Sequence, residues 1–161
     1  MDIFDAARSN EVTALRSFID AGQINSIDAR GSSPLIIAGY YGHLEAVNCL
    51  LQYGADTEIK DSMGNTALMG VCFKGYLAVA AALCEQGAVI DHPNGNGATA
   101  LTFAATFGQN EIIRLLLHKG ANPLHRDHFG KNPVDYALLQ GNAAGYEMLA
   151  RAANERIGIP Q

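Results

Sequence analysis

Histidines are the side chains of this sequence whose spacing first suggests chemistry. His92 and His125 stand at equivalent places in two consecutive copies of an internal repeat, and His128 follows closely. Imidazole nitrogens bind zinc and haem iron, so the three residues could form a ligand site. Two histidines at equivalent places of adjacent structural units would be about 10 Å apart, which is long for one ion. We therefore favour exposed loop histidines and keep a haem or metal chaperone as an alternative.

Carboxylates also recur with the period of this repeat. Asp28 and Asp61 are separated by one period, and Asp61 and Asp127 by two. Aspartate in a turn accepts hydrogen bonds from the backbone of its own loop, so we interpret these residues as turn caps and not as catalytic acids. The sequence contains no GxSxG, P-loop, HExxH or GxGxxG motif. We predict a protein that is not an enzyme and carries no cofactor.

Composition narrows the class of protein. The chain has 161 residues, of which 48% are hydrophobic and 17% charged, as is typical of a globular domain. Its net charge of −5 argues against general nucleic-acid binding. No apolar run reaches the roughly 18 residues of a membrane span, and the N-terminus lacks the apolar segment of a secretion signal. Cys49, Cys72 and Cys84 form no CxxC pair, so we expect reduced core thiols in a cytoplasmic protein.

A repeat with a period of about 33 residues organises the chain. Three landmarks keep this step: a Ser, Thr or Asn that starts a helical pattern, a glycine shortly before it, and a glycine after it. They are Ser33, Thr66, Thr99 and Asn132; Gly31, Gly64, Gly97 and Gly130; and Gly42, Gly75, Gly108 and Gly141. We predict a single domain, 1–161, of five repeats: 1–25, 26–58, 59–91, 92–124 and 125–161.

Each repeat predicts two short helices and a loop. In the second repeat Ser33 is a hydroxyl N-cap, and Pro34 suits the first helical turn. Gly42 ends that helix, and the apolar positions of HLEAVNCLLQYG form the stripe of a second one. Neither helix alone can bury its apolar side chains, so neighbouring repeats must stack. We therefore expect an all-α solenoid of stacked helix-turn-helix units, joined by β-turn or hairpin-like loops.

The repeats resemble ankyrin repeats, whose signature has a TPLHxA core, a GH turn and a GAD ending. The matching stretches are SPLIIAGYYGHLEAVNCLLQYGAD, TALMGVCFKGYLAVAAALCEQGA, TALTFAATFGQNEIIRLLLHKGAN and NPVDYALLQGN. The family's TPLH histidine ties the helix to its turn, but Ile36, Met69, Thr102 and Asp135 stand there, so some turns are expected to be looser. The resemblance implies a non-enzymatic module that binds another protein through loop tips and the concave surface of its first helices. We expect a monomer.

Candidate contact residues follow from this resemblance. In the family, the two positions before the helix-ending glycine point into the groove, and the residue before the tip glycine lies at a loop tip. Several of these positions here hold aromatic, methionine or basic residues, and these types are enriched at interfaces. The alternative is that the rings pack between repeats. The predicted partner-binding residues are Arg30, Tyr40, Tyr41, Met63, Phe73, Lys74, Asn96, Phe107, Arg126, His128, Phe129 and Lys131.

The repeat register separates two rings that are four positions apart, Phe103 and Phe107. Residues at this spacing on a helix share a face, which would suggest that both are core. Phe103 aligns with Ile37 and Tyr136, and we assign it to the core. Phe107 aligns with Lys74, so we expect it to face solvent and to contact a partner.

A further resemblance bears on the identity of the partner. NTALMGVCFKGYL and GATALTFAATFGQNE are similar to stretches of small bacterial ankyrin proteins associated with catalase. That similarity implies support of catalase or haem supply under oxidative stress. The alternatives are an immunity or antitoxin protein that blocks a toxin or effector enzyme, and the haem or metal chaperone. The tail IGIPQ is expected to fray.

Overall fold

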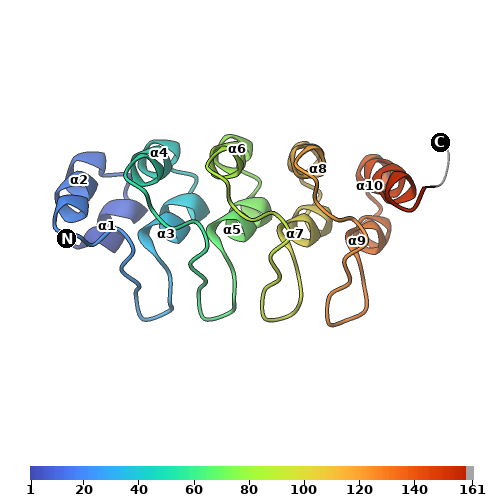
Figure 1. Ribbon diagram of the computed structural model, residues 1–161, viewed down its shortest axis with the longest axis horizontal. Helices are drawn as coiled ribbons and strands as arrows, with labels where there is room; N and C mark the ends of the chain where they lie inside the picture. The colour runs from blue at the N-terminus through green and yellow to red at the C-terminus, as the bar shows by residue number, and fades with distance from the viewer. Residues whose placement is uncertain (159–161) are drawn as a thin grey trace. The chain divides into compact units, whose positions relative to one another are not determined.

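The computed structural model describes residues 1–158, and helices are the only regular secondary structure within that range (Figure 1). The last three residues of the predicted frayed tail lie outside it. The helices are α1 (Ile3–Arg8), α2 (Val12–Asp20), α3 (Pro34–Tyr40), α4 (Leu44–Gln52), α5 (Ala67–Lys74), α6 (Leu77–Glu85), α7 (Ala100–Thr106), α8 (Asn110–His118), α9 (Pro133–Leu139) and α10 (Ala143–Arg156). The all-α fold of helix pairs is therefore confirmed.

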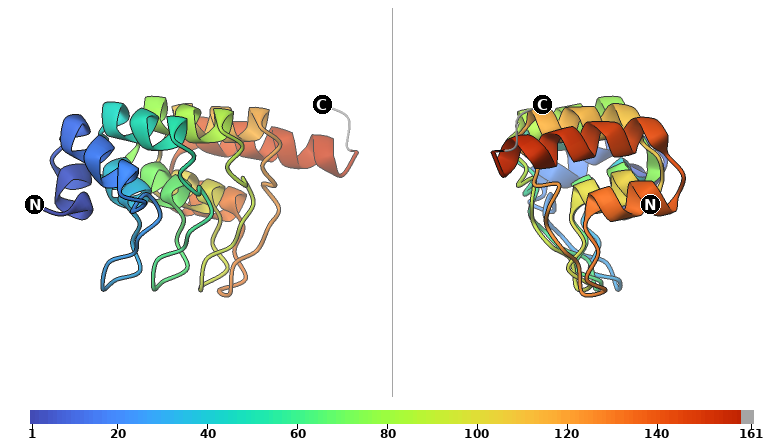
Figure 2. Two further views of the ribbon diagram at one scale, coloured as in Figure 1. Left: turned by 60° about the vertical axis from the view of Figure 1, so that its left-hand side comes forward. Right: turned by 90° about the vertical axis from the view of Figure 1, so that its right-hand side faces the viewer.

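The chain divides into two compact units. The first, Met1–Val89, holds α1 to α6, and the second begins at Ile90 and holds α7 to α10. Within each unit the first helix of every pair, here called an inner helix, packs on the next inner helix. The second, or outer, helices form a separate layer, and the loops project to one side (Figure 2). The grouping of all repeats into one domain stays a prediction.

Side-chain caps begin most of the inner helices. Ser33 Oγ accepts the Ile36 amide at 3.2 Å. Thr99 and Thr102 form a capping box, in which each side chain accepts the other's amide, at 3.4 and 3.0 Å. Asn132 and Asp135 form a second box. Thr102 and Asp135 stand where the family has histidine, so these two turns are tied by another hydrogen bond and are not loose.

The loops are hairpin-like, as predicted. At each tip one side-chain oxygen accepts the amides two and four residues ahead, at 2.8 to 3.1 Å. The acceptors are Asp28, Asp61, Asn94 and Asp127. The interpretation of the aspartates as turn caps is confirmed. The fourth member was missed in the sequence because it is an asparagine.

A second series of side chains links consecutive repeats within each unit. Asn25, Glu58 and Asp91 each accept an amide 31 residues ahead, at 2.9, 3.1 and 3.0 Å. The three acceptors stand at the same position of three consecutive repeats, 33 residues apart. These bonds fasten the loop that follows an outer helix to the preceding repeat, and so they fix the register in which helix pairs stack.

The core of each unit lies between its inner and outer layers. Leu35, Leu68, Leu50 and Leu83 fill it in the first unit, and Leu101, Ile113, Leu116 and Leu149 fill it in the second. All three cysteines are free and buried, which confirms the expectation of core thiols. Burial, followed by the neighbouring Cys84, raises the pKa of Cys72 far above its ordinary value, so this thiol stays protonated.

Candidate protein-interaction surfaces

In the first unit, four predicted residues gather at the ends of α3 and α5. We call Tyr40, Tyr41, Phe73 and Lys74 the Tyr40 cluster. The rings of Tyr40 and Phe73 stack across the repeat boundary, with centroids 6.4 Å apart and planes 8° apart. Tyr41 meets Tyr40 edge-on at 5.6 Å, and the Lys74 ammonium lies 5.1 Å from the centre of the Tyr40 ring. Such contacts restrict the motion of these side chains.

Glycines make room for this cluster. A Cβ atom at Gly70 would lie 3.7 Å from Tyr40 Cδ2, so the ring covers a position that has no side chain. The neighbouring Val71 is larger than the alanine usual in the family, and a Cβ atom at Gly39 would come within 3.1 Å of its Cγ2. Gly39 of one repeat thus leaves space for the side chain of Val71 of the next repeat.

The cluster is packed on one side and open on the other. Tyr40 is 41% exposed and Tyr41 48% exposed, whereas Phe73 is half-buried. Tyr40 and Phe73 therefore pack on each other between repeats while both keep some exposure to solvent, and their contact with a partner stays a prediction. Arg30 and Met63 are exposed at the neighbouring loop tips, where the Ser62 amide donates to the Arg30 carbonyl at 2.9 Å.

In the second unit, a hollow of about 180 Å³ opens between α7, α9 and the loop tips. We call it the Phe107 hollow; its wall includes Asn96, Phe103, Phe107, Asp127, Phe129 and Tyr136. The assignment of Phe103 to the core was wrong. This ring is only half-buried and lines the hollow beside the exposed Phe107, because the next repeat leaves part of it uncovered.

A buried carboxylate lies in the wall of the hollow. Asp127 Oδ1 accepts the amides of Phe129 and Lys131, and Oδ2 accepts the Tyr136 hydroxyl. Burial alone would raise the pKa of Asp127, but these hydrogen bonds and the Lys131 charge outweigh it and hold the pKa below its ordinary value. Burial and the same carboxylate raise the pKa of Tyr136 to about 12. The pair therefore carries one negative charge at neutral pH.

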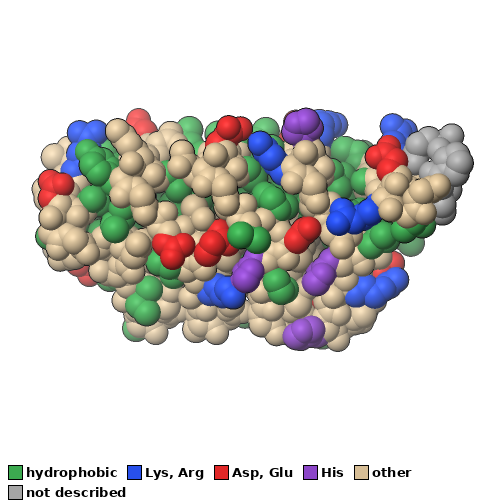
Figure 3. Space-filling model, viewed as in Figure 1, with side chains coloured by type: hydrophobic (Ala, Val, Ile, Leu, Met, Phe, Trp, Pro, Cys, Tyr) green, Lys and Arg blue, Asp and Glu red, His purple; other side chains and the backbone are tan. Residues whose placement is uncertain are grey.

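The remaining predicted residues lie at the last loop tip. Arg126 is exposed; it donates to the Gly130 carbonyl at 2.6 Å and pairs with Asp135 at 3.2 Å. The His128 amide donates to the Asn96 carbonyl at 2.9 Å, and the ring of His128 is exposed. On the face shown in Figure 3, histidine, basic and hydrophobic side chains all occur over the loops.

The histidines have mainly structural surroundings. His125 Nε2 lies 2.9 Å from the Gly97 carbonyl, and His43 Nε2 lies 2.8 Å from the Arg8 carbonyl. His92 Nε2 is buried without a hydrogen-bond partner among the described residues. No group of three or more His, Cys, Asp or Glu residues suited to a metal ion occurs within 1–158. The geometry does not assemble the ligand site that the spacing of the histidines suggested.

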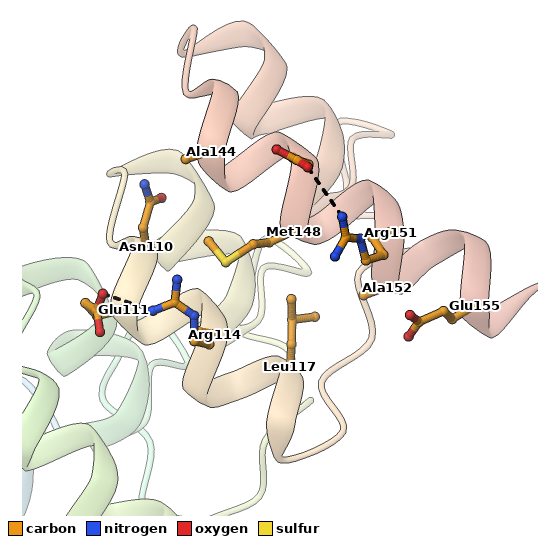
Figure 4. Close-up of a pocket in the computed structure, with 10 residues that line it drawn as sticks. Asn110, Glu111, Arg114, Leu117, Ala144, Met148, Arg151, Ala152 and Glu155 are labelled. Carbon is orange, nitrogen blue, oxygen red and sulfur yellow. Dashed lines mark hydrogen bonds and ion pairs between the residues drawn. The ribbon is translucent and has the colours of Figure 1, made fainter. Parts of the chain in front are cut away.

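A larger hollow, of about 600 Å³, lies between the outer helices α8 and α10 (Figure 4). Leu117 and Met148 both project into the space between the two helices, and charged side chains surround them. Four of these charged side chains pair within their own helices: Glu111 with Arg114 at 3.0 Å, and Glu147 with Arg151 at 3.4 Å. The sequence did not predict this hollow, because the hollow depends on the distance between α8 and α10.

No helix within residues 1–158 combines the length and apolar character needed to cross a lipid bilayer.

Comparison with known proteins agrees with this architecture. A family model described as ankyrin repeats in three copies matches residues 3–94 and 87–159. The E3 ubiquitin-protein ligase hecd-1 of Caenorhabditis elegans is 30% identical over 137 residues. The match covers 84% of this chain but only 4% of that ligase. The chain belongs to the ankyrin repeat family, whose fold is in general a non-catalytic scaffold for protein–protein interaction.

Proposed function

We propose that this chain binds a partner protein through its loop tips and the ends of its inner helices. The observation that carries the proposal is the exposure of large apolar side chains at equivalent places of several repeats. Tyr41 and Phe107 are 48% and 50% exposed at one position of the repeat, and Met63 and Phe129 are 62% and 70% exposed at another. Aromatic and methionine side chains supply much of the energy of protein interfaces, and a soluble surface rarely carries them in groups without a role.

The mechanism we propose is docking onto surfaces that are already ordered. The stack of Tyr40 on Phe73 and the double hydrogen bonds at each tip restrict these side chains before binding. Ordering a free side chain at an interface costs about 0.5–1.5 kcal/mol, so a prearranged surface loses less of its contact energy on association. Lys74 and Arg30 add positive charge in the first unit, which would speed association with an acidic partner.

The test is affinity capture with matched variants of the whole chain. Tyr41→Ala and Phe107→Ala should lose partners that the unaltered chain retains. Tyr53→Ala is the control, because Tyr53 is as exposed as Tyr41, at 48%, but follows the outer helix α4. Melting temperatures must accompany each capture. A half-exposed ring should cost about 1 kcal/mol or less of folding free energy, whereas a core phenylalanine would cost about 3–5 kcal/mol.

The finer interpretations of the sequence stay predictions. A catalase gene beside this one would favour support of catalase, and a toxin gene would favour immunity. If the chaperone alternative is right, haem added to the protein should give a Soret band that is lost when His92 and His125 are replaced. The absence of such a band would contradict that alternative. The cytoplasmic location and the monomeric state likewise await measurement. The ligase activity of the relative is not proposed for this chain.

A further inference from the structure

We infer that the Phe107 hollow holds one arginine side chain of the bound protein. This inference rests on the proposed function and adds to it the chemistry of one contact. It concerns the second unit alone, and it follows from the rings, the single charge and the size of the hollow.

Aromatic rings form much of the wall. Phe103 lies on α7 and Phe107 directly follows that helix, while Tyr136 lies on α9 and Phe129 at a loop tip, so the lining rings come from separate segments of the chain. The face of an aromatic ring attracts a cation within about 6 Å of its centre. A guanidinium group is planar and weakly hydrated, and it stacks on such rings better than an ammonium does.

The charge of the wall favours a cation. Asp127 is the one charged side chain among the described residues that line the hollow. A carboxylate offers about four acceptor positions, and hydrogen bonds from Phe129, Lys131 and Tyr136 use three of them. One position therefore remains for a donor from the partner. Of the two nearby cations, Arg126 is paired with Asp135, and Lys131, whose charge also stabilises the Asp127 carboxylate, does not line the hollow and leaves its space open.

The size of the hollow suits a single side chain. Its volume of about 180 Å³ is below the roughly 300–1,000 Å³ of sites that bury drug-sized ligands. It is several times the roughly 30 Å³ that one water molecule occupies in the liquid. A long side chain can enter it, whereas a cofactor or a helix cannot.

The experiment is an NMR titration of the full chain with short capped peptides. One peptide carries arginine between glycines, a second carries citrulline, which keeps the shape without the charge, and a third carries lysine. We expect saturable shifts of the Phe107, Phe129 and Lys131 amides with the arginine peptide. The citrulline peptide should bind about tenfold more weakly or worse, since a hydrogen bond to a charged group is much the stronger.

Two variants complete the test. Asp127→Asn removes the charge but keeps the turn, because Asn94 makes the same two amide contacts at 2.9 Å in the preceding repeat. It should weaken the arginine peptide about tenfold. Asn94→Asp adds a second carboxylate to the wall of the hollow and should tighten binding of the same peptide.

Several results would overturn the inference. They are equal affinity for the arginine and citrulline peptides, tighter binding of the lysine peptide, unchanged affinity after Asp127→Asn, or no saturable shift at the hollow. The proposed function is separate from these outcomes. If a captured partner is lost with Phe107→Ala but retained with Asp127→Asn, the surface binds protein and the arginine contact is wrong.

Discussion

The Tyr40 cluster and the Phe107 hollow occupy equivalent positions of the repeat, yet one is filled and the other is open. In the first unit Gly70 has no side chain, and Tyr40 covers it and stacks on Phe73. In the second unit both inner helices carry a ring at the position of Gly70, Phe103 on α7 and Tyr136 on α9, and both rings line the hollow. Thr106 and Leu139 stand there at the positions of Tyr40 and Phe73, so the stacked pair of the first unit has no counterpart in the second.

The two surfaces also differ in charge. Lys74 places an ammonium over the Tyr40 ring, whereas a buried carboxylate lies in the wall of the Phe107 hollow. The same scaffold thus offers a cation on a packed aromatic surface in one unit and an anion within aromatic walls in the other. A partner that contacts both would need complementary charges at separate points.

The largest effect is expected at the turns that follow the inner helices. Gly42 and Gly108 are equivalent and have positive φ angles of 73° and 68°, where alanine is strained by about 1–2 kcal/mol. A Cβ atom at Gly42 would also lie 2.8 Å from the Tyr76 ring, whereas Gly108 has nothing within 4 Å. Gly42→Ala should cost about 3 kcal/mol in urea unfolding, and Gly108→Ala about 1 kcal/mol. Equal losses would show that Tyr76 does not pack there.

A smaller effect should follow from filling the space that Gly70 leaves for the Tyr40 ring. Gly70→Phe places in α5 the residue that α7 carries at this position, and it should displace Tyr40 and cost about 1–3 kcal/mol by overpacking. Gly70→Ala is the matched control. Its Cβ atom would make an ordinary 3.7 Å contact, and alanine favours the helix by about 1 kcal/mol. Near-ultraviolet circular dichroism should change for the phenylalanine variant alone; no change would contradict the role of Gly70.

Acid should reveal the buried carboxylate of the second unit. The pKa of Asp127 lies below its ordinary value of 3.8 in the folded chain, so its stabilising effect is present above that value and is lost as pH falls through the folded pKa. Asp127→Asn should therefore cost about 1–2 kcal/mol at neutral pH and almost nothing in strong acid. Urea unfolding at a series of pH values measures the difference. A loss that does not depend on pH would mean that the charge contributes nothing.

The smallest expected effect is an alkaline shift at Tyr136. Its pKa of about 12 exceeds the ordinary 10.0, so the stabilisation is complete below the ordinary value and is lost as pH rises through about 12. Asp127→Asn should move the phenol back toward its ordinary pKa, as followed by tyrosinate absorbance. Tyr136→Phe identifies the signal among the tyrosines. An unchanged titration in the Asn variant would contradict the hydrogen bond.

Much of the fold could be predicted from the sequence because it depends on local patterns. The spacing of Gly42, Gly75 and Gly108 marked the turns, and Asp61 identified a loop tip, since each acts on its own few residues. Exposure of Phe107 was also predictable, because a position that accepts lysine in another repeat is compatible with water. The choice of partner-binding residues stays a prediction.

What escaped prediction depends on pairs of residues from different repeats. Phe103 was assigned to the core because its equivalents are apolar, but its burial depends on what the next repeat places over it. The packing of Tyr40 over Gly70 likewise could not be predicted, because it depends on how α3 and α5 lie together. Asn94 was passed over because it differs in type from Asp61, although the two make the same turn.

Hydrogen exchange of the chain with a captured partner tests the central claim most directly. We expect slower exchange in the complex at the loop tips around Met63 and Phe129 and at the residues after α7. Exchange in the outer helices α4 and α8 should not change. Protection confined to α8 and α10, where Leu117 and Met148 line the outer hollow, would contradict the claim that this protein binds through its inner helices and loop tips.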